Sequence, residues 1–357
     1  MIQQCLNTLY VQSPEAHVRL DHDTLRVTIG DEEAVRVPLH HLGGVVLFGG
    51  ASMSQGALER CAEEGREVTF LSLNGRFRFR VEGPTSGNVL LRLAQMDAHR
   101  DQARTLEIAR RSVAAKIHNS RLVLLRGARD ARSEEDRERL TQAVGALDGF
   151  LATATTASSV DTLRGIEGEV AAWYFSVYGR LLTVPTAEFA FAQRTRRPPR
   201  DRVNALLSFL YSILTHDCAG AVEGVGLDPQ IGFLHSVRPG RLGLALDLAE
   251  EFRAGLVDRL VATLINRRQV RPDHFEVREG AGESVMLTEE GRKAVLVAYQ
   301  KRKQERVAHS LLKEEVPLGL VPHLQARLLA RHLRGELPRY PPFLFGRRRQ
   351  GRGKRDA

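Results

Sequence analysis

The chain has 357 residues, 43% of them hydrophobic, which predicts roughly two folded domains and excludes both a disordered protein and a small disulfide scaffold. Its three cysteines, Cys5, Cys61 and Cys218, are widely spaced with no CxxC pair. Neither a disulfide framework nor a zinc ribbon is therefore expected, and a reducing, cytoplasmic location fits. The most apolar early stretch, 42–51, is about ten residues long and contains four glycines. We therefore expect no signal peptide and no membrane span.

The net charge of +9 is unevenly distributed. Residues 1–90 contain 8 arginines, no lysine and 11 acids, which gives −3, so residues 91–357 carry +12. Only 6 of the 52 basic residues are lysines, and the planar guanidinium of arginine suits bidentate phosphate contacts. A GC-rich genome would produce the same bias. The charge therefore indicates a polyanion partner for the second part of the chain without proving one.

Residues 4 to about 48 carry the alternating and β-branched patterns of short strands, which we expect to be antiparallel. The turn sequences DHD and GDEE fall between strand segments, which are predicted at 6–11, 17–20, 24–29 and 34–39. A helix is predicted at 54–64. The pair Asn74-Gly75 then predicts a hairpin with a type I′ turn. One face of its second strand carries Arg76, Arg78 and Arg80, which we expect to be solvated, with phosphate contact as the alternative.

Strand patterns end at GPTSGN, residues 83–88, and long helical patterns follow. We therefore expect an α+β protein with an N-terminal β-rich, β-sandwich-like domain (1–85), a larger all-helical domain (86–345) and a basic, disordered tail (346–357). Amphipathic helices are predicted at about 106–124, 135–153, 160–180, 202–217, 243–266, 289–308 and 322–334. A small hairpin within 274–287 is the expected exception.

The predicted helix 160–180 carries a carboxylate on its apolar face. At about 100° of rotation per residue, Glu167 falls within the stripe of apolar side chains and Glu169 falls outside it. A buried carboxylate must be paired, protonated or bound to a metal, because desolvating an unpaired charge costs several kcal/mol. Glu167 is therefore expected to form an ion pair, with Arg164 nearby, or to bind a metal.

The predicted helix 243–266 shows the same feature. Glu250 lies among its apolar side chains, Asp247 lies at the edge of that face, and Glu251 and Asp258 lie beyond the edge. Asp247 and Glu250 are three residues apart, so their carboxylates can converge on one cation. The alternative is a salt-bridged face with Arg253 as the partner.

A histidine, His235, lies in the glycine- and proline-containing loop 232–241, directly before this helix. Two buried glutamates on separate helices and a nearby imidazole form a three-ligand set that leaves positions open for water or substrate. Oxygen ligands suit magnesium, and the imidazole shifts the preference toward manganese. Such a site can polarise a phosphoryl oxygen and align an in-line displacement.

Arginines crowd the segment before the apolar helix 202–217, at positions Arg194, Arg196, Arg197, Arg200 and Arg202. A basic loop joined to a core helix can clamp phosphates, and a solvated basic linker is the alternative. The aromatic content of 6%, with one tryptophan, argues against a stacking platform for single strands.

Several ordered motifs resemble the Cas1 family, the CRISPR-associated integrases of spacer acquisition. The resemblance extends through the N-terminal half and so covers nearly the whole chain. The ending LPRYPPFLF looks like that of type I-C members. The matching segments are LHHLGGVVLFGG, LSLNGRFRFRVEG, GIEG with the following YF pair, RPPRDRVNALLSFLYSIL, GLDPQIGFLH and LALDLAEEFR.

The resemblance implies an N-terminal β-rich dimerisation domain and a helical catalytic domain. It also implies that Glu167, His235 and Glu250 are the metal ligands, with Asp247 as an adjacent acid and possible ligand. The helical-wheel argument selected the same two glutamates independently. Many relatives have a serine where this chain has Gly243, which leaves the acids in place. Two homodimers of the family flank a dimer of the small partner Cas2, and the assembly holds a short double-stranded protospacer for insertion at a CRISPR repeat.

The sequence therefore predicts a metal-dependent DNA endonuclease and integrase that uses Mn²⁺ or Mg²⁺ and the 3′-hydroxyl of the incoming DNA as the nucleophile. Arg194, Arg196, Arg197 and Arg200 are predicted to contact the DNA backbone. Two alternatives remain. One is a non-catalytic DNA-binding scaffold in which the acids are structural pairs, and the other is a general metal-dependent nuclease that uses water.

Overall fold

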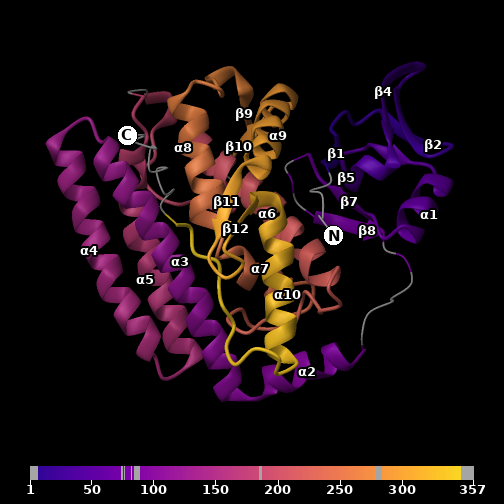
Figure 1. Cartoon of the computed structure of the whole chain (residues 1–357). Coiled ribbons are helices and arrows are strands. Elements are labelled where there is room, and N and C mark those ends of the chain that lie inside the picture. The colour runs from indigo at the N-terminus through magenta and orange to yellow at the C-terminus, as the bar shows by residue number, and fades with distance from the viewer. Residues whose placement is uncertain are drawn as a thin grey trace, which may run out of the picture.

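The computed structural model describes residues 7–73, 75, 77–81, 83, 89–184, 187–278 and 284–346. A strand-rich region comes first and a larger helical region follows, which confirms the predicted α+β class (Figure 1). The predicted boundary at 85/86, Cys5 and the tail after residue 346 lie outside the described residues. Cys61 and Cys218 are free and buried.

The strands of the N-terminal region form two four-stranded sheets. One has the order β1 (Asn7–Val11), β5 (Leu42–Phe48), β7 (Glu67–Leu71) and β8 (Phe77–Val81). The other has the order β4 (Glu32–Pro38), β3 (Thr24–Ile29), β2 (Ala16–Asp21) and β6 (Ser52–Met53). Helix α1 (Gln55–Glu63) lies between β6 and β7 in the chain and matches the predicted helix.

The expectation of antiparallel strands is wrong for the first sheet, in which β1, β5 and β7 run parallel. Parallel neighbours need a crossover between them. Strands β2, β3 and β4 of the second sheet form the crossover from β1 to β5, and β6 with α1 forms the one from β5 to β7. Strand β8 pairs antiparallel with β7, as the predicted hairpin requires, and Gly75 in its turn has φ +75°. Asn74 and Arg76 lie outside the described residues.

The helical region matches most of the predicted helices and adds α2 (Val89–Arg100), which was not predicted. Side-chain caps fix several helix starts, as where Asp201 accepts from the backbone of Asn204 at 2.7 Å. The remaining helices are α3 (Gln102–Asp130), α4 (Glu134–Thr156), α5 (Val160–Tyr178), α6 (Arg202–Glu223), α7 (Gly243–Ala249), α8 (Arg259–Asn266), α9 (Glu289–Gln304) and α10 (Val321–Leu333).

Two details of the helical region differ from the prediction, and a third agrees with it. The predicted helix 243–266 is not continuous, because a π-helical segment, Arg253–Asp258, separates α7 from α8. Helix α9 ends at Gln304, and a second hairpin, β11 (Arg306–His309) with β12 (Glu314–Pro317), follows it. The predicted hairpin within 274–287 is present as β9 (Phe275–Arg278) and β10 (Ser284–Leu287), with residues 279–283 undescribed.

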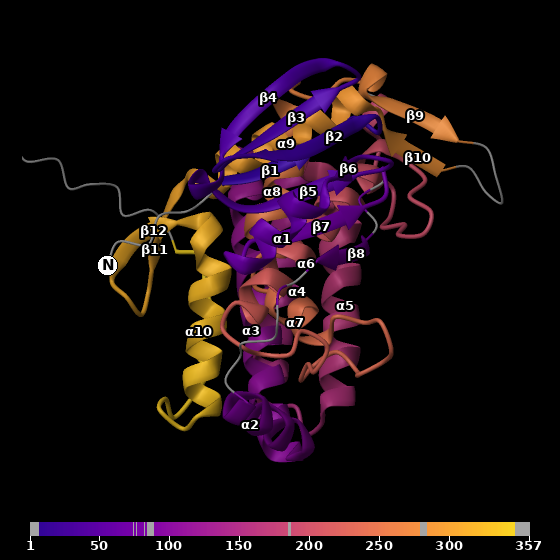
Figure 2. The ribbon, with the colours of Figure 1, turned by 90° about the vertical axis from the view of Figure 1, so that its right-hand side faces the viewer.

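Helix α6 passes through the core of the helical region. By length and composition it could cross a membrane, but 61% of its apolar window is buried within the protein, as is typical of a core helix. The first sheet packs on it, since Phe48 of β5 stacks on Phe209 of α6 with centroids 6.1 Å apart. The sheets lie at one end of the molecule and α2 at the other, with α7 and its flanking loop between them (Figure 2). This loop and α7, with the residue that caps it, carry His235, Asp247 and Glu250 of the predicted site.

Candidate metal centre

The carboxylate of Glu167 is held by α5, whose apolar face is buried as predicted. Leu163, Ile166 and Val170 are at most 7% exposed, whereas the side chain of Glu167 is 26% exposed. Glu169 is exposed, also as predicted. The expected partner Arg164 turns away and donates from Nε to the carbonyl of Leu234 at 2.7 Å. Glu167 therefore directs its carboxylate toward other helices.

The carboxylate of Glu250 is the more deeply buried of the two, with its side chain 3% exposed at the end of α7. Arg253 Nε lies 3.1 Å from its Oε1, which confirms the alternative partner expected from the sequence. Burial alone would raise the pKa of Glu250, but Arg253 and Lys116 outweigh burial and hold it at about 2. Glu250 is consequently a carboxylate over the whole neutral range.

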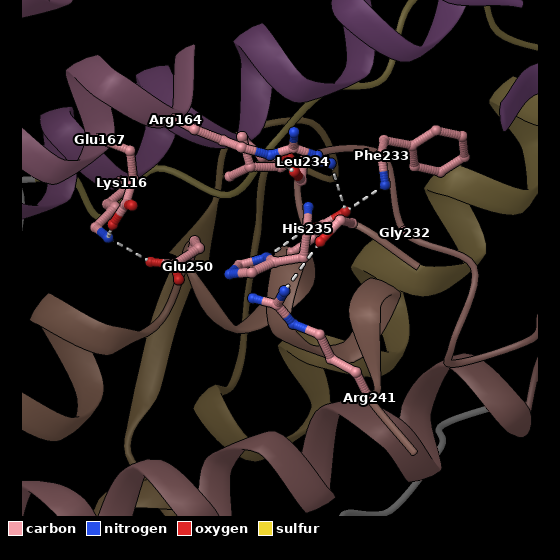
Figure 3. Close-up of polar contacts among 12 residues, drawn as sticks. Lys116, Arg164, Glu167, Gly232, Phe233, Leu234, His235, Arg241 and Glu250 are labelled. Atoms are coloured by element: carbon pink, nitrogen blue, oxygen red, sulfur yellow. Dashed lines mark hydrogen bonds and ion pairs between the residues drawn. The ribbon is translucent and has the colours of Figure 1, made fainter. Parts of the chain in front are cut away.

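One ammonium group joins the two glutamates. Lys116 of α3 contacts Glu167 Oε1, and its Nζ lies 2.8 Å from Glu250 Oε2 (Figure 3). The Lys116 side chain is 13% exposed. Burial alone would lower its pKa, but the carboxylates of Glu250 and Glu167 outweigh burial and raise it. The two predicted acids thus converge on a single cation supplied by a third helix.

Sequence reasoning missed Lys116. It flanks the apolar stripe of the predicted helix 106–124 and is one of six lysines in a chain with 52 basic residues. Those two facts together were the available signal. They could not identify its partners, because both glutamates lie far along the chain on other elements.

The imidazole of His235 is oriented by Asp247. Its Nδ1 lies 2.7 Å from Asp247 Oδ1, and its ring points toward Glu250 (Figure 3). Because a carboxylate only accepts, Nδ1 carries the hydrogen, and in the neutral ring the lone pair is then on Nε2. Among the described residues none bonds to that Nε2. This is the tautomer that a metal-binding histidine requires.

Asp247 itself is committed to the loop. Its Oδ2 accepts from the backbone N–H groups of Phe233 and Leu234 at 2.5 and 3.0 Å, and its Oδ1 accepts from that of His235 at 3.0 Å. Both oxygens are therefore occupied by the segment that carries the histidine. These bonds hold His235 in place, and the role of Asp247 as a possible ligand stays a prediction.

Helix α2 supports the same loop from below. Gln95, fully buried, donates from Nε2 to the carbonyls of Asp228 and Ile231 at 2.9 Å each and accepts from Asp228 N at 2.8 Å. His99 Nδ1 bonds the carbonyl of Gly232 at 2.8 Å. The position of His235 thus depends on a helix that the sequence patterns did not reveal.

The donor set fits a divalent cation, although it is not closed around one. Within the described residues no three His, Cys, Asp or Glu side chains meet in an arrangement that would hold a metal ion. Two carboxylates nevertheless already share one cation, the Lys116 ammonium, and an imidazole with a free Nε2 faces the more buried of them. Oxygen and imidazole donors of this kind suit Mg²⁺ and Mn²⁺. That Glu167, Glu250 and His235 hold such an ion stays a prediction.

Two acids predicted beyond the edge of the apolar face are instead buried. Glu251 is 0% exposed and accepts hydrogen bonds from Gln325, Tyr340 and the backbone of Phe343, so the C-terminal segment covers it. Asp258, 2% exposed, accepts from Tyr211. Burial raises the pKa of Glu251 to about 7 and that of Asp258 to about 6. The helical wheel misjudged both acids because this segment is enclosed on every side.

The predicted DNA-contacting arginines fall into two groups. Arg194 is tied into the fold, donating from Nη1 to Asn204 Oδ1 at 2.7 Å and from Nη2 to Ser208 at 3.0 Å. Arg196, Arg197 and Arg200 are exposed. Arg196 also lines a small cavity that Lys116 and Arg253 share. Of the three exposed arginines, Arg196 therefore lies beside Lys116, which contacts both glutamates.

This architecture is that of known CAS1 proteins. The solved structure of a CAS1 protein from Thermotoga maritima superposes with a TM-score of 0.79 and 25% sequence identity, covering 96% of this chain and 99% of that one. The order of a strand-rich region followed by a helical domain thus matches that of a CAS1 protein over nearly the whole chain.

The sequence matches the family described as CRISPR associated protein Cas1 over residues 9–301. A CRISPR-associated endonuclease Cas1 from Moorella thermoacetica is 50% identical over 340 residues, or 95% of this chain and 98% of that protein. Another, from Rhodospirillum rubrum, is 47% identical over 348 residues, or 96% of this chain and 100% of that protein. The chain belongs to the Cas1 family, which confirms the resemblance; the expected type I-C subtype stays a prediction.

Proposed function

We propose that the chain is a metal-dependent DNA endonuclease and integrase of CRISPR adaptation. The observation that carries the proposal is the convergence of Glu167 and Glu250, from separate elements, on one cation beside an imidazole whose Nδ1 is fixed by Asp247. The endonuclease names of its relatives support it. A scaffold that only binds DNA would have no need of a histidine held with Nε2 free.

In the proposed reaction the 3′-hydroxyl of the incoming DNA attacks a phosphodiester of the array. A bond forms between this 3′-oxygen and phosphorus as the bond from phosphorus to the 3′-oxygen of the array strand breaks. The attacking hydroxyl gives its proton to solvent, and the leaving oxygen takes up a proton from solvent. Mn²⁺ or Mg²⁺, when bound, would polarise the phosphoryl oxygen and stabilise the leaving oxygen. Glu167, Glu250 and His235 hold and orient the site, and no protein side chain need act as the nucleophile.

The partners follow from the same proposal. Double-stranded DNA, as protospacer and CRISPR repeat, would reach the site past Arg196, Arg197 and Arg200, which are exposed and basic. A homodimer formed through the N-terminal β-rich domain (1–85) would work with the small partner Cas2. The helical region (86–345) would carry the chemistry, in the cytoplasm.

Strand transfer on a supercoiled plasmid with a CRISPR repeat tests this function. The assay contains Mn²⁺, a short duplex and the cognate Cas2. Glu167→Ala should lower joining by at least about 100-fold, because one of two carboxylate ligands is lost. Glu169→Ala is the matched control, since it removes an exposed acid from the same helix.

The outcomes separate the alternatives. Loss of joining in Glu167→Ala alone, with DNA binding retained, supports the integrase. Equal joining by wild type and Glu167→Ala contradicts the ligand set. Binding without joining by any protein favours the scaffold, and cleaved but unjoined products favour a nuclease that uses water.

A further inference from the structure

The most unusual feature of the site is a buried lysine between two proposed metal ligands. Lys116 comes from α3, Glu167 from α5 and Glu250 from the end of α7, so three elements meet at one ammonium group. The neighbours of Lys116 on α3, Ser112 and Ser120, are both 4% exposed. The packing of α3 therefore places Lys116 inside the protein, so it is not a surface side chain.

The charges of this cluster are balanced. Lys116 and Arg253 supply two positive charges, and Glu167 and Glu250 supply two negative ones. Each Glu250 oxygen faces one cation, Oε2 facing Lys116 at 2.8 Å and Oε1 facing Arg253 at 3.1 Å. A divalent ion added to this arrangement would meet an ammonium group that already holds the same carboxylate oxygens. The two cations exclude each other on steric and electrostatic grounds.

We propose that Lys116 is a placeholder cation, which occupies the position between Glu167 and Glu250 in the metal-free protein and must leave it for the metal to bind. This inference rests on the proposed metal site. It accounts for two observations at once: the acids converge on a cation, and the described residues nevertheless form no closed metal cluster. The ammonium keeps two carboxylates together that would otherwise repel each other.

A small cavity beside the site can receive the displaced ammonium group of Lys116. Lys116 lines a small cavity together with Asp258, Tyr174 and Tyr211, on the side of the site where Arg194, Arg196 and Arg253 also lie. Asp258 is the one carboxylate among these lining residues. A side chain as flexible as lysine can move its ammonium group from the glutamates toward this cavity without a shift of α3.

Manganese affinity tests the placeholder directly. We would titrate wild type, Lys116→Met and Lys116→Arg with Mn²⁺ at one pH, in the absence of DNA, and measure free Mn²⁺ by electron paramagnetic resonance. Methionine keeps the apolar stem and removes the competing charge. Lys116→Met should therefore bind Mn²⁺ at least about tenfold more tightly than wild type, given the coupling measured for close buried charges. Lys116→Arg, which keeps the charge, should bind no more tightly than wild type.

Controls cover the case in which Lys116→Met folds poorly without metal. Lys293→Met removes an exposed cation on α9 and should leave the affinity unchanged. The increase in melting temperature on adding Mn²⁺ should be larger for Lys116→Met than for wild type, even if its metal-free melting temperature is lower.

Two failures can be told apart. Mn²⁺ bound by wild type, with equal or weaker affinity in Lys116→Met, would overturn the placeholder and leave the metal site intact. Absence of Mn²⁺ binding in every protein, with Glu167→Ala as reference, would overturn the metal site and the placeholder together.

Discussion

A single carboxylate, Asp247, determines where the imidazole of His235 points. It accepts three backbone N–H groups of the loop and the ring Nδ1–H, and its side chain is 5% exposed. Four donors on two oxygens make this one of the best-satisfied acids of the site. It shapes the loop and selects the histidine tautomer in one step.

Replacing Asp247 with Asn should weaken metal binding without removing a ligand. The amide NH₂ would face backbone N–H donors, so the loop loses acceptors and His235 loses its fixed orientation. We expect Mn²⁺ affinity to fall about 10- to 100-fold, measured by the same titration. Asp228→Asn is the control, because the Asp228 side chain accepts from Gln230 N at 2.8 Å in the same loop and is not one of the partners found for His235 among the described residues. Equal affinities for both variants would contradict the positioning role.

At the residue scale the sequence revealed some of the site and concealed the rest for a physical reason. Periodicity identified Glu167 and Glu250, because a carboxylate on an apolar helix face is visible in the spacing alone. It could not find the contacts of Lys116 with the two glutamates or the hydrogen bonds of Asp247 to the loop of His235. Both depend on which groups other elements bring to the same point, and spacing within one helix carries no information about that.

At the element scale, the segment that bears Glu250 is not the regular helix that its pattern predicts. Helix α7 ends at Ala249, and a π-helical segment begins at Arg253. Gly255 lies within that segment, where an added Cβ would come 2.3 Å from the ring of Phe345. The wide turn thus brings the backbone against the C-terminal segment, a contact that no local pattern encodes. The existence of the helices was predictable, but this interruption was not.

The loop of His235 approaches α7 too closely for a side chain. A Cβ on Gly232 would lie 2.6 Å from the carbonyl carbon of Gly243 and 2.8 Å from Asp247 Oδ2. The atoms that this Cβ would contact include backbone atoms of Gly243, which cannot move away as the end of a flexible side chain could. Gly243 is equally confined, since its own Cβ would lie 2.7 Å from the carbonyl oxygen of Gln230. The start of α7 is therefore tightly packed against this loop.

Gly232→Ala should consequently destabilise the protein by about 1–3 kcal/mol, the usual cost of overpacking. The loop would have to move away from α7, which would also pull Phe233 and Leu234 from Asp247. Denaturant unfolding measures the first effect and Mn²⁺ titration the second. Gly145→Ala, in α4 with nothing within 4 Å of its Cβ, is the control and should not be destabilised. A Gly232→Ala protein as stable as wild type would show that the loop has room to spare.

At the scale of the whole molecule, α6 joins the sheets to the helical core. His216 of α6 stacks on Phe77 of β8, with ring centroids 4.9 Å apart. One residue further, Asp217 accepts from Tyr299 and Lys303 of α9, each at 2.8 Å. The C-terminal half of α6 therefore makes both an aromatic contact with the first sheet and a polar contact with α9. The sequence predicted the two regions but not this junction.

Acid should loosen this junction through His216. Burial, the largest effect, lowers the pKa of His216 to about 4 from an ordinary value of 6.5. A histidine with a lowered pKa in the folded state contributes stability that is present above its unfolded pKa and is lost as the pH falls from about 6.5 to about 4. Protonation would place a poorly solvated charge in this contact, so the first sheet should separate from α6 first.

His216→Phe keeps an aromatic ring on Phe77 and removes the proton-binding group. Between pH 7.5 and pH 5 we expect the unfolding free energy of wild type to fall by about 1 kcal/mol more than that of the variant. This is less than the full pKa shift would give, because His216 is only partly buried and solvent screens its charge. Denaturant unfolding at the two pH values measures the difference. His40→Phe, at an exposed position, should behave as wild type. If His216→Phe lost as much stability as wild type on acidification, the acid sensitivity would have to arise elsewhere than at the contact between α6 and the first sheet.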